Sequence, residues 1–327
     1  MNESKRVMSG AWRSWVAGLR GAALSVLLVM GGLSGCSTNP ATGQSQLNIL
    51  SESREITLGE EASPQFLAEY GGALPDAQVL SYVRGLGRQL AAVSERPELP
   101  WSFEVVDSSV INAFALPGGK VFISRGLLAK MTNEAQLAGV LGHEIGHVTA
   151  QHIGQQMTRA TGIQLGLVVA GVAASMSDED LLAVLGVAGG EMAAGVYLLK
   201  FGRDQEHQAD ELGLRYMTRL GFDPMGQVQV MRILKDASGG GGSVEFLSTH
   251  PLPESRIERL EGMIRERYPD SGTSAYGFGE ARFEQEVLSR LRALPAAKHP
   301  KQGADAGGAM PVVAWCGSCA ESHRVGG

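Results

Sequence analysis

The stretch L-G-H-E-I-G-H, from Leu141 to His147, determines the expected fold and chemistry of this chain. Helix-compatible residues surround it and predict one continuous helix from Asn133 to about Ala160. This helix would open at Thr132 or Asn133, with a glutamine three residues after Asn133 completing a capping box. The stretch reads H-E-x-x-H, so its chemistry depends on where an α-helix places these three side chains.

His143 and His147 are four residues apart, slightly more than one helical turn, so both imidazoles leave the same face of the helix. Histidine is a common zinc ligand, and Zn–N bonds of about 2.0–2.1 Å require this kind of convergence. Glu144 lies about 100° round the helix from His143, where it can take a proton from a metal-bound water. The alternative is a chance H-E-x-x-H whose histidines are satisfied by hydrogen bonds alone. His152 is half a turn out of phase with His143, and we expect it to face away from the ion as a structural or exposed residue.

Composition and the N-terminal segment together indicate an exported, acidic, globular protein. Of 327 residues, 44% are hydrophobic, which is enough for a large core, and the net charge is −6. Because the chain has no basic run, we expect no nucleic-acid partner. Residues 1–35 read as a signal peptide whose apolar run, Ala22 to Leu33, is too short for a comfortable membrane span.

The run Leu33-Ser-Gly-Cys36 resembles the lipobox of bacterial lipoproteins, in which the cysteine becomes an acylated N-terminus. The resemblance implies a lipid anchor at Cys36 on the periplasmic side of a membrane. Ser37 after the cysteine favours the outer membrane over the inner membrane by the sorting rules of such proteins. The alternative is an ordinary signal peptide. Residues 36–50 read as a tether between lipid and fold, and 295–327, rich in Gly, Ala and Pro, as a disordered tail.

Residues 51–294 are expected to form one α+β domain with mostly α structure. Helices are predicted from Ser51 to about Tyr70 and after the cap residue Asp76, followed by three short strands between Trp101 and Ser124. We expect one of these, carrying Asn112, Ala113, Phe114 and Ala115, to be an edge strand that pairs with an extended peptide. The alternative is a purely structural hairpin.

Two further segments have less specific signals. Apolar stretches within 162–199 predict a helical hairpin that packs on the core or touches the membrane. Cys316 and Cys319 superficially match a redox motif, but they lack a βαβ context, which leaves a local disulfide or no function.

A catalytic zinc site needs a third protein ligand and an open fourth position. Glu206 and Asp210 share a helix face, so Glu206 can bind the ion while Asp210 accepts the other ring N–H of a ligating histidine. His207 is the rival third ligand, although it points about 100° away from Glu206. The alternative is a solvated charged face.

These motifs together resemble the gluzincin metallopeptidases of family 48, typified by the CAAX prenyl protease. The resemblance covers most of residues 51–265, including the strand after Asn112, the Glu206-x-x-Ala-Asp210 run and Ser248-Thr-His-Pro251. With the lipobox, it points to the soluble bacterial branch that includes a periplasmic protease assisting β-barrel assembly. That relative carries helical repeats, and no 34-residue repeat is visible in this sequence.

The resemblance implies a zincin-like fold, one Zn²⁺ per chain held by His143, His147 and Glu206, and Glu144 as general base. It also implies polypeptide substrates, and with the export signal these would be misfolded or unassembled envelope proteins. We further hypothesise that His250, in a loop after a glycine run, occupies the fourth zinc position and holds the enzyme latent. The other readings are a His250 that merely orders its loop, a chaperone-like lipoprotein with structural zinc, or a zinc hydrolase acting on cell-wall peptide.

Overall fold

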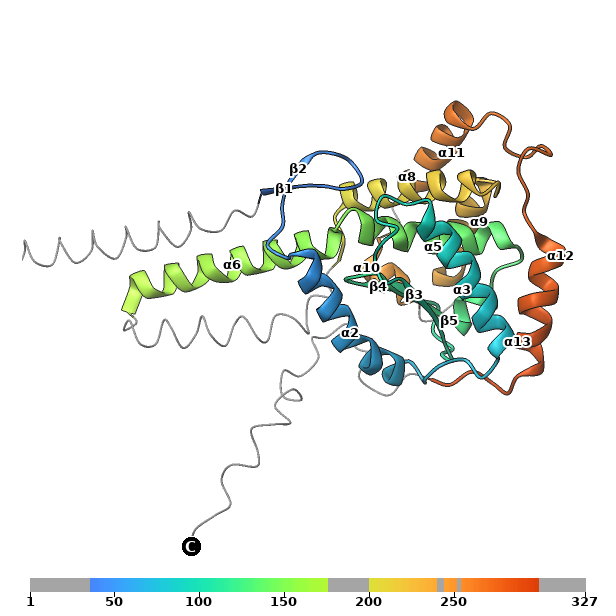
Figure 1. Ribbon diagram of the computed structural model, residues 1–327, viewed down its shortest axis with the longest axis horizontal. Helices are drawn as coiled ribbons and strands as arrows, with labels where there is room; N and C mark the ends of the chain where they lie inside the picture. Colours follow the sequence, from blue (N-terminus) through green and yellow to red (C-terminus); the bar gives the residue numbers. More distant parts are fainter. Residues whose placement is uncertain (1–35, 176–199, 240–243, 252–253, 300–327) are drawn as a thin grey trace, which may run out of the picture.

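The computed structural model describes residues 36–175, 200–239, 244–251 and 254–299 of the chain. In this part, helices surround a three-stranded sheet, and a two-stranded hairpin precedes them (Figure 1). The predicted α+β architecture with mostly α structure is confirmed. The signal segment 1–35, the apolar stretch 181–199 and the tail from residue 300, with its two cysteines, lie outside the described residues.

The described strands are β1 (Cys36–Thr38), β2 (Ser45–Leu47), β3 (Ser102–Val106), β4 (Ala113–Leu116) and β5 (Lys120–Ser124). The helices up to residue 175 are α2 (Glu52–Glu69), α3 (Ala77–Ala92), α4 (Arg125–Leu128), α5 (Glu134–Thr149) and α6 (His152–Ser175). The later helices are α8 (Arg203–Arg219), α9 (Met225–Gly239), α10 (Phe246–Thr249), α11 (Glu254–Arg267), α12 (Glu280–Phe283), the π-helical turn η2 (Glu284–Leu288) and α13 (Ser289–Ala293).

The helix starts follow the capping chemistry expected from the sequence. The Ser51 hydroxyl and the Asp76 carboxylate accept backbone N–H groups at the starts of α2 and α3. At α5, the Asn133 side chain accepts the N–H of Gln136 at 2.9 Å, and Gln136 reaches back to accept the Thr132 N–H at 2.7 Å. The start of the H-E-x-x-H helix is therefore fixed from both sides.

The sheet has the order β3-β5-β4, with β5 parallel to β3 and antiparallel to β4. The turn from β4 to β5 uses Gly118 and Gly119 at φ values of 71° and 89°, which favour glycine. Strand alternation then divides the sheet into two apolar faces. Phe122 and its neighbours face α2, whereas Phe103 and its neighbours join the main core with α3 and α5. Strand β4 lies at one edge, as the sequence predicted.

Helix α5 packs closely against α8 and α9 because glycines line its contact face (Figure 1). A Cβ atom added at Gly142 would lie 3.2 Å from the Gly213 Cα, and one added at Gly139 would lie 2.9 Å from the Gln227 Cα. Such distances leave no room for side chains, so the backbones of the helices approach one another directly. Every residue of α5 is buried.

The expected continuous helix over 133–160 is wrong. Helix α5 ends at Thr149, Gln151 adopts a φ of 55°, and α6 begins at His152. A side chain with a Cβ rarely adopts a positive φ, and here polar side chains surround the break and hold it. The Ala150 carbonyl oxygen accepts N–H groups from Asn39 and Gln155, each at 3.0 Å.

The segment 36–50 was expected to be a tether, but it forms the β1–β2 hairpin and packs on the body. Its Asn39 bonds to the break after α5, and the Ile49 N–H donates to the Thr158 hydroxyl at 3.0 Å. Helix α6 projects away from the sheet (Figure 1). Of the helices in the described residues, none has the length and apolar character that crossing a membrane requires.

The C-terminal part of the described chain closes the fold on the side of α3. Helices α12 to α13 pack against α3, and Arg290 contacts the Asp76 carboxylate at 3.0 Å. The disordered tail predicted over 295–327 begins too early, because Lys298 forms a β-bridge with Ser108, just after β3. Its N–H donates to the Asp107 carbonyl oxygen at 3.1 Å, and its carbonyl oxygen accepts the Ser109 N–H at 2.8 Å.

Candidate metal centre

The two histidines of H-E-x-x-H converge as the helical spacing predicted. The Nε2 atoms of His143 and His147 are 3.1 Å apart, and both side chains are buried. Neither atom can be a hydrogen-bond donor to the other unless one ring carries its proton there. Two imidazole nitrogens that face each other at this distance suit a shared cation.

Glu206, on α8, places its carboxylate next to the Nε2 atoms of His143 and His147. This helix starts at Gly202, whose N–H donates to the Gln205 side chain at 3.1 Å, so Glu206 lies in the first turn. Its two carboxylate oxygens are each 3.6 Å from one histidine: Oε2 from His143 Nε2 and Oε1 from His147 Nε2. The close glycine packing of α5 on α8 permits this approach.

His250 completes the group from the end of α10. Its Nδ1 lies 3.0 Å from Glu206 Oε1 and 3.4 Å from His143 Nε2. The Phe246 ring stacks on it with centroids 4.4 Å apart, and the His250 N–H donates to the Phe246 carbonyl oxygen at 2.9 Å. His250 is therefore held inside the cluster by its own short helix.

These four residues fit a tetrahedral divalent cation. Their ligand atoms lie within 4.8 Å of one another, and the separations given above run from 3.0 to 3.6 Å. Ligand atoms around a tetrahedral zinc at about 2.0–2.1 Å lie about 3.3 Å apart. The residues present, two imidazoles and one carboxylate from two long helices and a third imidazole at the end of α10, are also typical zinc donors.

Behind the ligands, Asp210 and Arg256 form a buried charged layer. Asp210 Oδ1 is 3.0 Å from His143 Nδ1, as expected for an acceptor that orients the ring. Arg256 is fully buried and donates to both Asp210 oxygens, at 2.9 and 2.7 Å, while its Nη1 is 2.5 Å from Glu206 Oε2. Burial alone would raise the pKa of Asp210, but Arg256 and His143 hold it well below its ordinary value.

The charge balance of the buried cluster favours a bound cation. Glu144, Glu206 and Asp210 are three buried carboxylates, and Arg256 is the cation that contacts two of them. Against burial, His250 and Arg256 lower the pKa of Glu206, so it is ionised. Glu206 and Asp210 together carry more negative charge than Arg256 alone balances, which favours a bound cation beside them.

Glu144 differs from the other two carboxylates because no cationic group of the described residues lies within hydrogen-bond distance of it. Its Oε1 atom is buried, has no hydrogen-bond partner in the described part of the chain, and lies 3.7 Å from His250 Nε2. Burial raises the pKa of Glu144 above its ordinary value, against the opposing influence of His250 and His143. A carboxylate with a raised pKa beside a metal centre is suited to accepting a proton.

His152 corrects one expectation about the site. The break after Thr149 turns it back toward the cluster, so it is fully buried and its Nδ1 lies 3.0 Å from His147 Nδ1. Its Nε2 lies 3.1 Å from the Gln208 Oε1 atom. Burial lowers the pKa of His152 to about 4, which leaves the ring neutral near pH 7. The prediction that His152 faces away from the ion, as a structural or exposed residue, assumed one ideal helix.

His207, the rival third ligand, does not join the group that could hold a metal in the described residues. Strand β4, by contrast, begins close to the four residues that could hold the metal. The carbonyl oxygen of Ile111, just before β4, accepts the N–H of Phe246, whose ring stacks on His250. Because the Ser124 N–H donates to the Asn112 carbonyl oxygen, alternation turns the backbone groups of Ala113 and Ala115 away from β5.

Two contributors to the site carried no usable sequence signal. Arg256 is one of several charged residues on α11, and periodicity does not distinguish it from exposed neighbours. Gln208 sits in the polar run of α8 between His207 and Asp210. The capping residue Gly202 and the spacing to Asp210 could locate α8, but not the helix break that brings His152 to Gln208.

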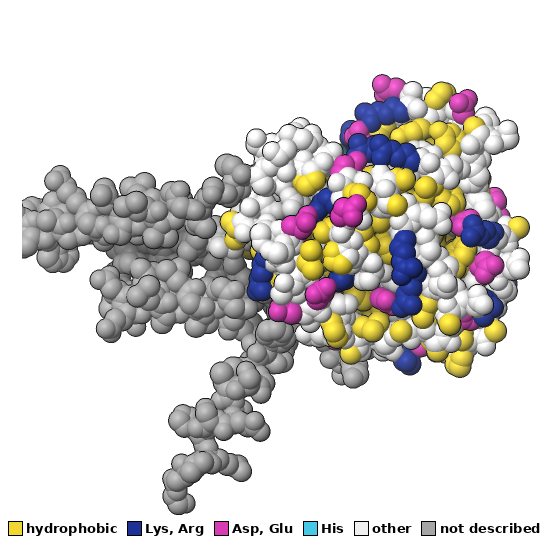
Figure 2. All heavy atoms as spheres, in the orientation of Figure 1, with side chains coloured by type: hydrophobic (Ala, Val, Ile, Leu, Met, Phe, Trp, Pro, Cys, Tyr) yellow, Lys and Arg dark blue, Asp and Glu magenta, His cyan; other side chains and the backbone are white. Residues whose placement is uncertain are grey.

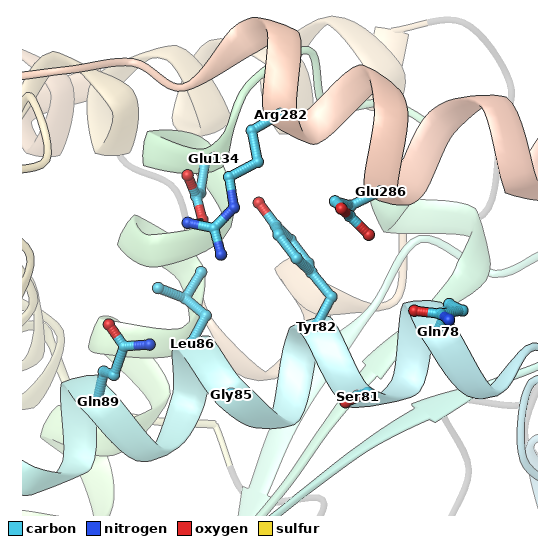
Figure 3. Close-up of a pocket in the computed structure, with 9 residues that line it drawn as sticks. All are labelled: Gln78, Ser81, Tyr82, Gly85, Leu86, Gln89, Glu134, Arg282 and Glu286. Carbon is cyan, nitrogen blue, oxygen red and sulfur yellow. Dashed lines mark ion pairs between the residues drawn. The ribbon is translucent and has the colours of Figure 1, made fainter.

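A cavity of about 250 Å³ lies at the other end of α5 from the histidine cluster (Figure 3). It is lined by Tyr82 and neighbouring α3 residues, by Glu134 and by Arg282 and Glu286 from the C-terminal helices. Arg282 pairs with Glu134 at 3.3 Å and lies over the Tyr82 ring at 5.3 Å. Glu134 begins α5, nine residues before His143, which is about 13 Å along the helix. This cavity is therefore separate from the histidine cluster.

The face drawn in Figure 2 carries Lys and Arg side chains interspersed with Asp and Glu side chains and with apolar patches. Neither sign of charge forms a continuous field over this face.

Comparisons with known proteins agree with this geometry. The model of peptidase family M48 matches residues 78–264, more than half of the chain. The mitochondrial metalloendopeptidase OMA1 of Schizosaccharomyces pombe is 31% identical over 240 residues, which is 72% of this chain and 68% of that protein. The β-barrel assembly-enhancing proteases of Yersinia pestis and Escherichia coli K12 are each 30% identical, over 77% and 71% of this chain.

The chain spans about half the length of these β-barrel assembly-enhancing proteases, 55% and 48% respectively. The family match includes both halves of the cluster, His143 with His147 and Glu206 with His250. The resemblance inferred from the motifs is thereby confirmed. The chain belongs to peptidase family M48, a metalloendopeptidase family, and carries an intact His/His/Glu/His metal site.

Proposed function

We propose that this protein is a zinc-dependent endopeptidase of the bacterial cell envelope that cleaves misfolded or unassembled envelope proteins. The observation that carries the proposal is the convergence of His143, His147 and Glu206 beside the buried carboxylate of Glu144. The names of the relatives support the reaction, since OMA1 is a metalloendopeptidase and the bacterial relatives are proteases that enhance β-barrel assembly. Zinc is proposed from the donor set.

In the proposed reaction, His143, His147 and Glu206 hold the ion. A bound zinc supplies Lewis acidity, polarising the scissile carbonyl and acidifying a water molecule. Glu144 accepts the proton of the attacking water and later delivers a proton to the leaving amine, so the carboxylate is regenerated. Asp210 and Arg256 keep the ligand side chains oriented, and the Phe246 and Phe201 rings exclude water around His250 and His147.

We propose that a substrate peptide pairs with β4, which carries Ala113, Phe114 and Ala115 after Asn112. Support comes from the position of β4 at the edge of the sheet, where the Ala113 and Ala115 backbone groups face away from β5. Added as a further strand, an extended peptide gains main-chain hydrogen bonds that do not depend on its sequence. Such a binding mode suits unfolded chains of varied sequence.

His250 is proposed to hold the enzyme latent by occupying the fourth ligand position, because its Nδ1 lies among the other ligand atoms. The same four-residue set favours the second candidate function, a binding or chaperone-like protein with a closed structural zinc site. The two are distinguished by His250→Ala. Latency predicts faster peptide cleavage by this variant, whereas a structural site predicts no cleavage and weaker folding.

The membrane part of the proposal is a lipid anchor at Cys36 on the periplasmic side of the outer membrane. Support comes from the lipobox-like run before Cys36 and from the relatives that act in β-barrel assembly. Cys36→Ala should move the protein from the membrane fraction to the soluble periplasmic fraction. Unchanged fractionation, or residence in the inner membrane, contradicts this assignment.

The central test compares cleavage of casein and of an unfolded outer-membrane protein by three preparations: wild type, Glu144→Gln and chelated wild type. We expect cleavage by wild type, recovery after zinc is returned to the chelated protein, and loss of several orders of magnitude in Glu144→Gln with zinc still bound. Zinc binding without cleavage by wild type or His250→Ala would favour the structural-site reading.

A further inference from the structure

His152 makes contacts that the proposed catalytic step does not use. Its Nδ1 lies 3.0 Å from His147 Nδ1 and its Nε2 lies 3.1 Å from Gln208 Oε1, and the His152 side chain is itself fully buried. We propose that Gln208 and His152 form a hydrogen-bond relay that fixes the tautomer of His147 and presents its Nε2 to the metal. This inference rests on the metal centre proposed above.

The direction of the relay follows from the atoms involved. An amide oxygen only accepts, so the His152 Nε2 atom must donate to Gln208. A neutral imidazole has a single N–H, and His152 Nδ1 is then an acceptor. The proton between the two rings therefore belongs to His147 Nδ1. This leaves the lone pair on His147 Nε2, the atom that faces His143 Nε2 at 3.1 Å.

The backbone is shaped to make this contact. On a continuous helix, residues five apart lie about 140° from each other, so the two rings would point to different faces. The left-handed Gln151 breaks the helix between them and returns His152 to His147. The Gln151 side chain donates to Glu55 at 3.0 Å, and Asn39 donates to the Ala150 carbonyl oxygen. A strained residue is thus held in place by its surroundings.

Helix α8 supplies the outer partner of both histidines. Asp210 contacts His143 Nδ1 directly at 3.0 Å, and Gln208, two residues earlier, reaches His147 through His152. The first partner is a carboxylate and the second is a neutral relay. Removing the relay should therefore change the orientation and tautomer of His147 without changing the charge of the site.

The first test measures zinc affinity by competition with a chromophoric chelator. His152→Leu removes both hydrogen bonds and should weaken zinc binding 10- to 100-fold, a range typical of outer-shell partners. His152→Asn places an amide oxygen near the former Nδ1 and should retain affinity to within a few-fold. The control is Thr158→Val, which deletes a buried hydroxyl of α6 that accepts from Ile49 but lies outside the relay.

The second test reads the tautomer of His147 in zinc-free protein from its ¹⁵N ring resonances. We expect a protonated Nδ1 in wild type and in Gln208→Glu, which keeps an acceptor, and a mixture of tautomers in Gln208→Met. Gln208→Met also tests the relay if His152→Leu does not fold, because Gln208 is only half-buried. Its zinc affinity should fall in the same direction as that of His152→Leu.

A proton on His147 Nε2 in the zinc-free wild type overturns the relay, and so does wild-type zinc affinity in both His152→Leu and Gln208→Met. Equal losses in His152→Leu, His152→Asn and Thr158→Val also overturn it, since they show a general packing effect. These results leave the peptidase assignment intact if wild type binds zinc and cleaves. A wild type that binds no zinc overturns the metal centre and the relay together.

Discussion

Asp210 Oδ1 lies 3.0 Å from His143 Nδ1, on the side of the ring opposite the nitrogen that meets His147. The same carboxylate receives two hydrogen bonds from the buried Arg256. Asp210 thus connects His143, whose other ring nitrogen faces the metal position, with Arg256, which compensates the buried negative charge.

Asp210→Asn should weaken zinc binding 10- to 100-fold, because an amide orients His143 less strongly and no longer supplies a charge to Arg256. Competition with a chelator measures the change. Asp204→Asn is the matched control, since Asp204 lies on the same helix and is exposed. Similar affinities in both variants would show that the contact with His143 is not needed for binding.

Arg256→Gln should reduce the free energy of unfolding of the zinc-free protein by about 3–5 kcal/mol, because it leaves Glu206 and Asp210 buried without their cation. Urea titration of chelated protein measures the loss, and added zinc should recover part of it. Arg259→Gln, on the same helix α11 but 43% exposed, should cost less than about 1 kcal/mol. A comparable loss in the two variants contradicts the role given to Arg256.

Gly213→Ala should weaken both folding and zinc binding, because the added Cβ would lie 3.0 Å from the His143 backbone nitrogen and separate α8 from α5. The expected destabilisation is about 1–3 kcal/mol. Gly85→Ala provides the opposite control in α3, where nothing lies within 4 Å of the added atom. There the better helix propensity of alanine should stabilise the fold by about 0.5–1 kcal/mol. Thermal unfolding and zinc titration of both variants test the contrast.

Asp76 should give the fold a measurable pH dependence away from the metal site. Burial opposes ionisation, but the N–H groups of α3 and the Arg290 guanidinium together lower the pKa of Asp76. A lowered pKa in the folded state adds stability above the unfolded value, near pH 3.8, and this contribution is lost as the pH falls through the folded value. Asp76→Asn should keep most of the cap and lose this pH dependence, and Asp76→Ala should cost about 1 kcal/mol at pH 7. Urea titrations between pH 3 and pH 7 check both outcomes, and an unchanged slope in Asp76→Asn would contradict them.

The sequence was informative about features that are determined by the local geometry of a helix. The H-E-x-x-H spacing, the capping residues Ser51, Asp76 and Asn133 and the Glu206-to-Asp210 interval each depend on contacts within one or two helical turns. Such contacts are set by neighbours along the chain, so periodicity alone located them. The fold class followed from the same patterns.

Features that depend on distant contacts could not be read in this way. The break at Gln151 is held by Asn39, Glu55 and Gln155, and no local signal marks a glutamine for a positive φ. The parallel pairing of β3 with β5 and the burial of Arg256 likewise depend on tertiary packing. The role of His152 was missed for the same reason, because it depends on the break.

The β1–β2 hairpin has a consequence for how this protein would work on a membrane. The hairpin is ordered from Ser37 onward, so an acyl group on Cys36 would leave almost no flexible linker between the bilayer and the domain. The height and orientation of the domain above the lipid would then be set by the hairpin itself. A domain held in this way would reach only those substrate polypeptides that come to the membrane surface.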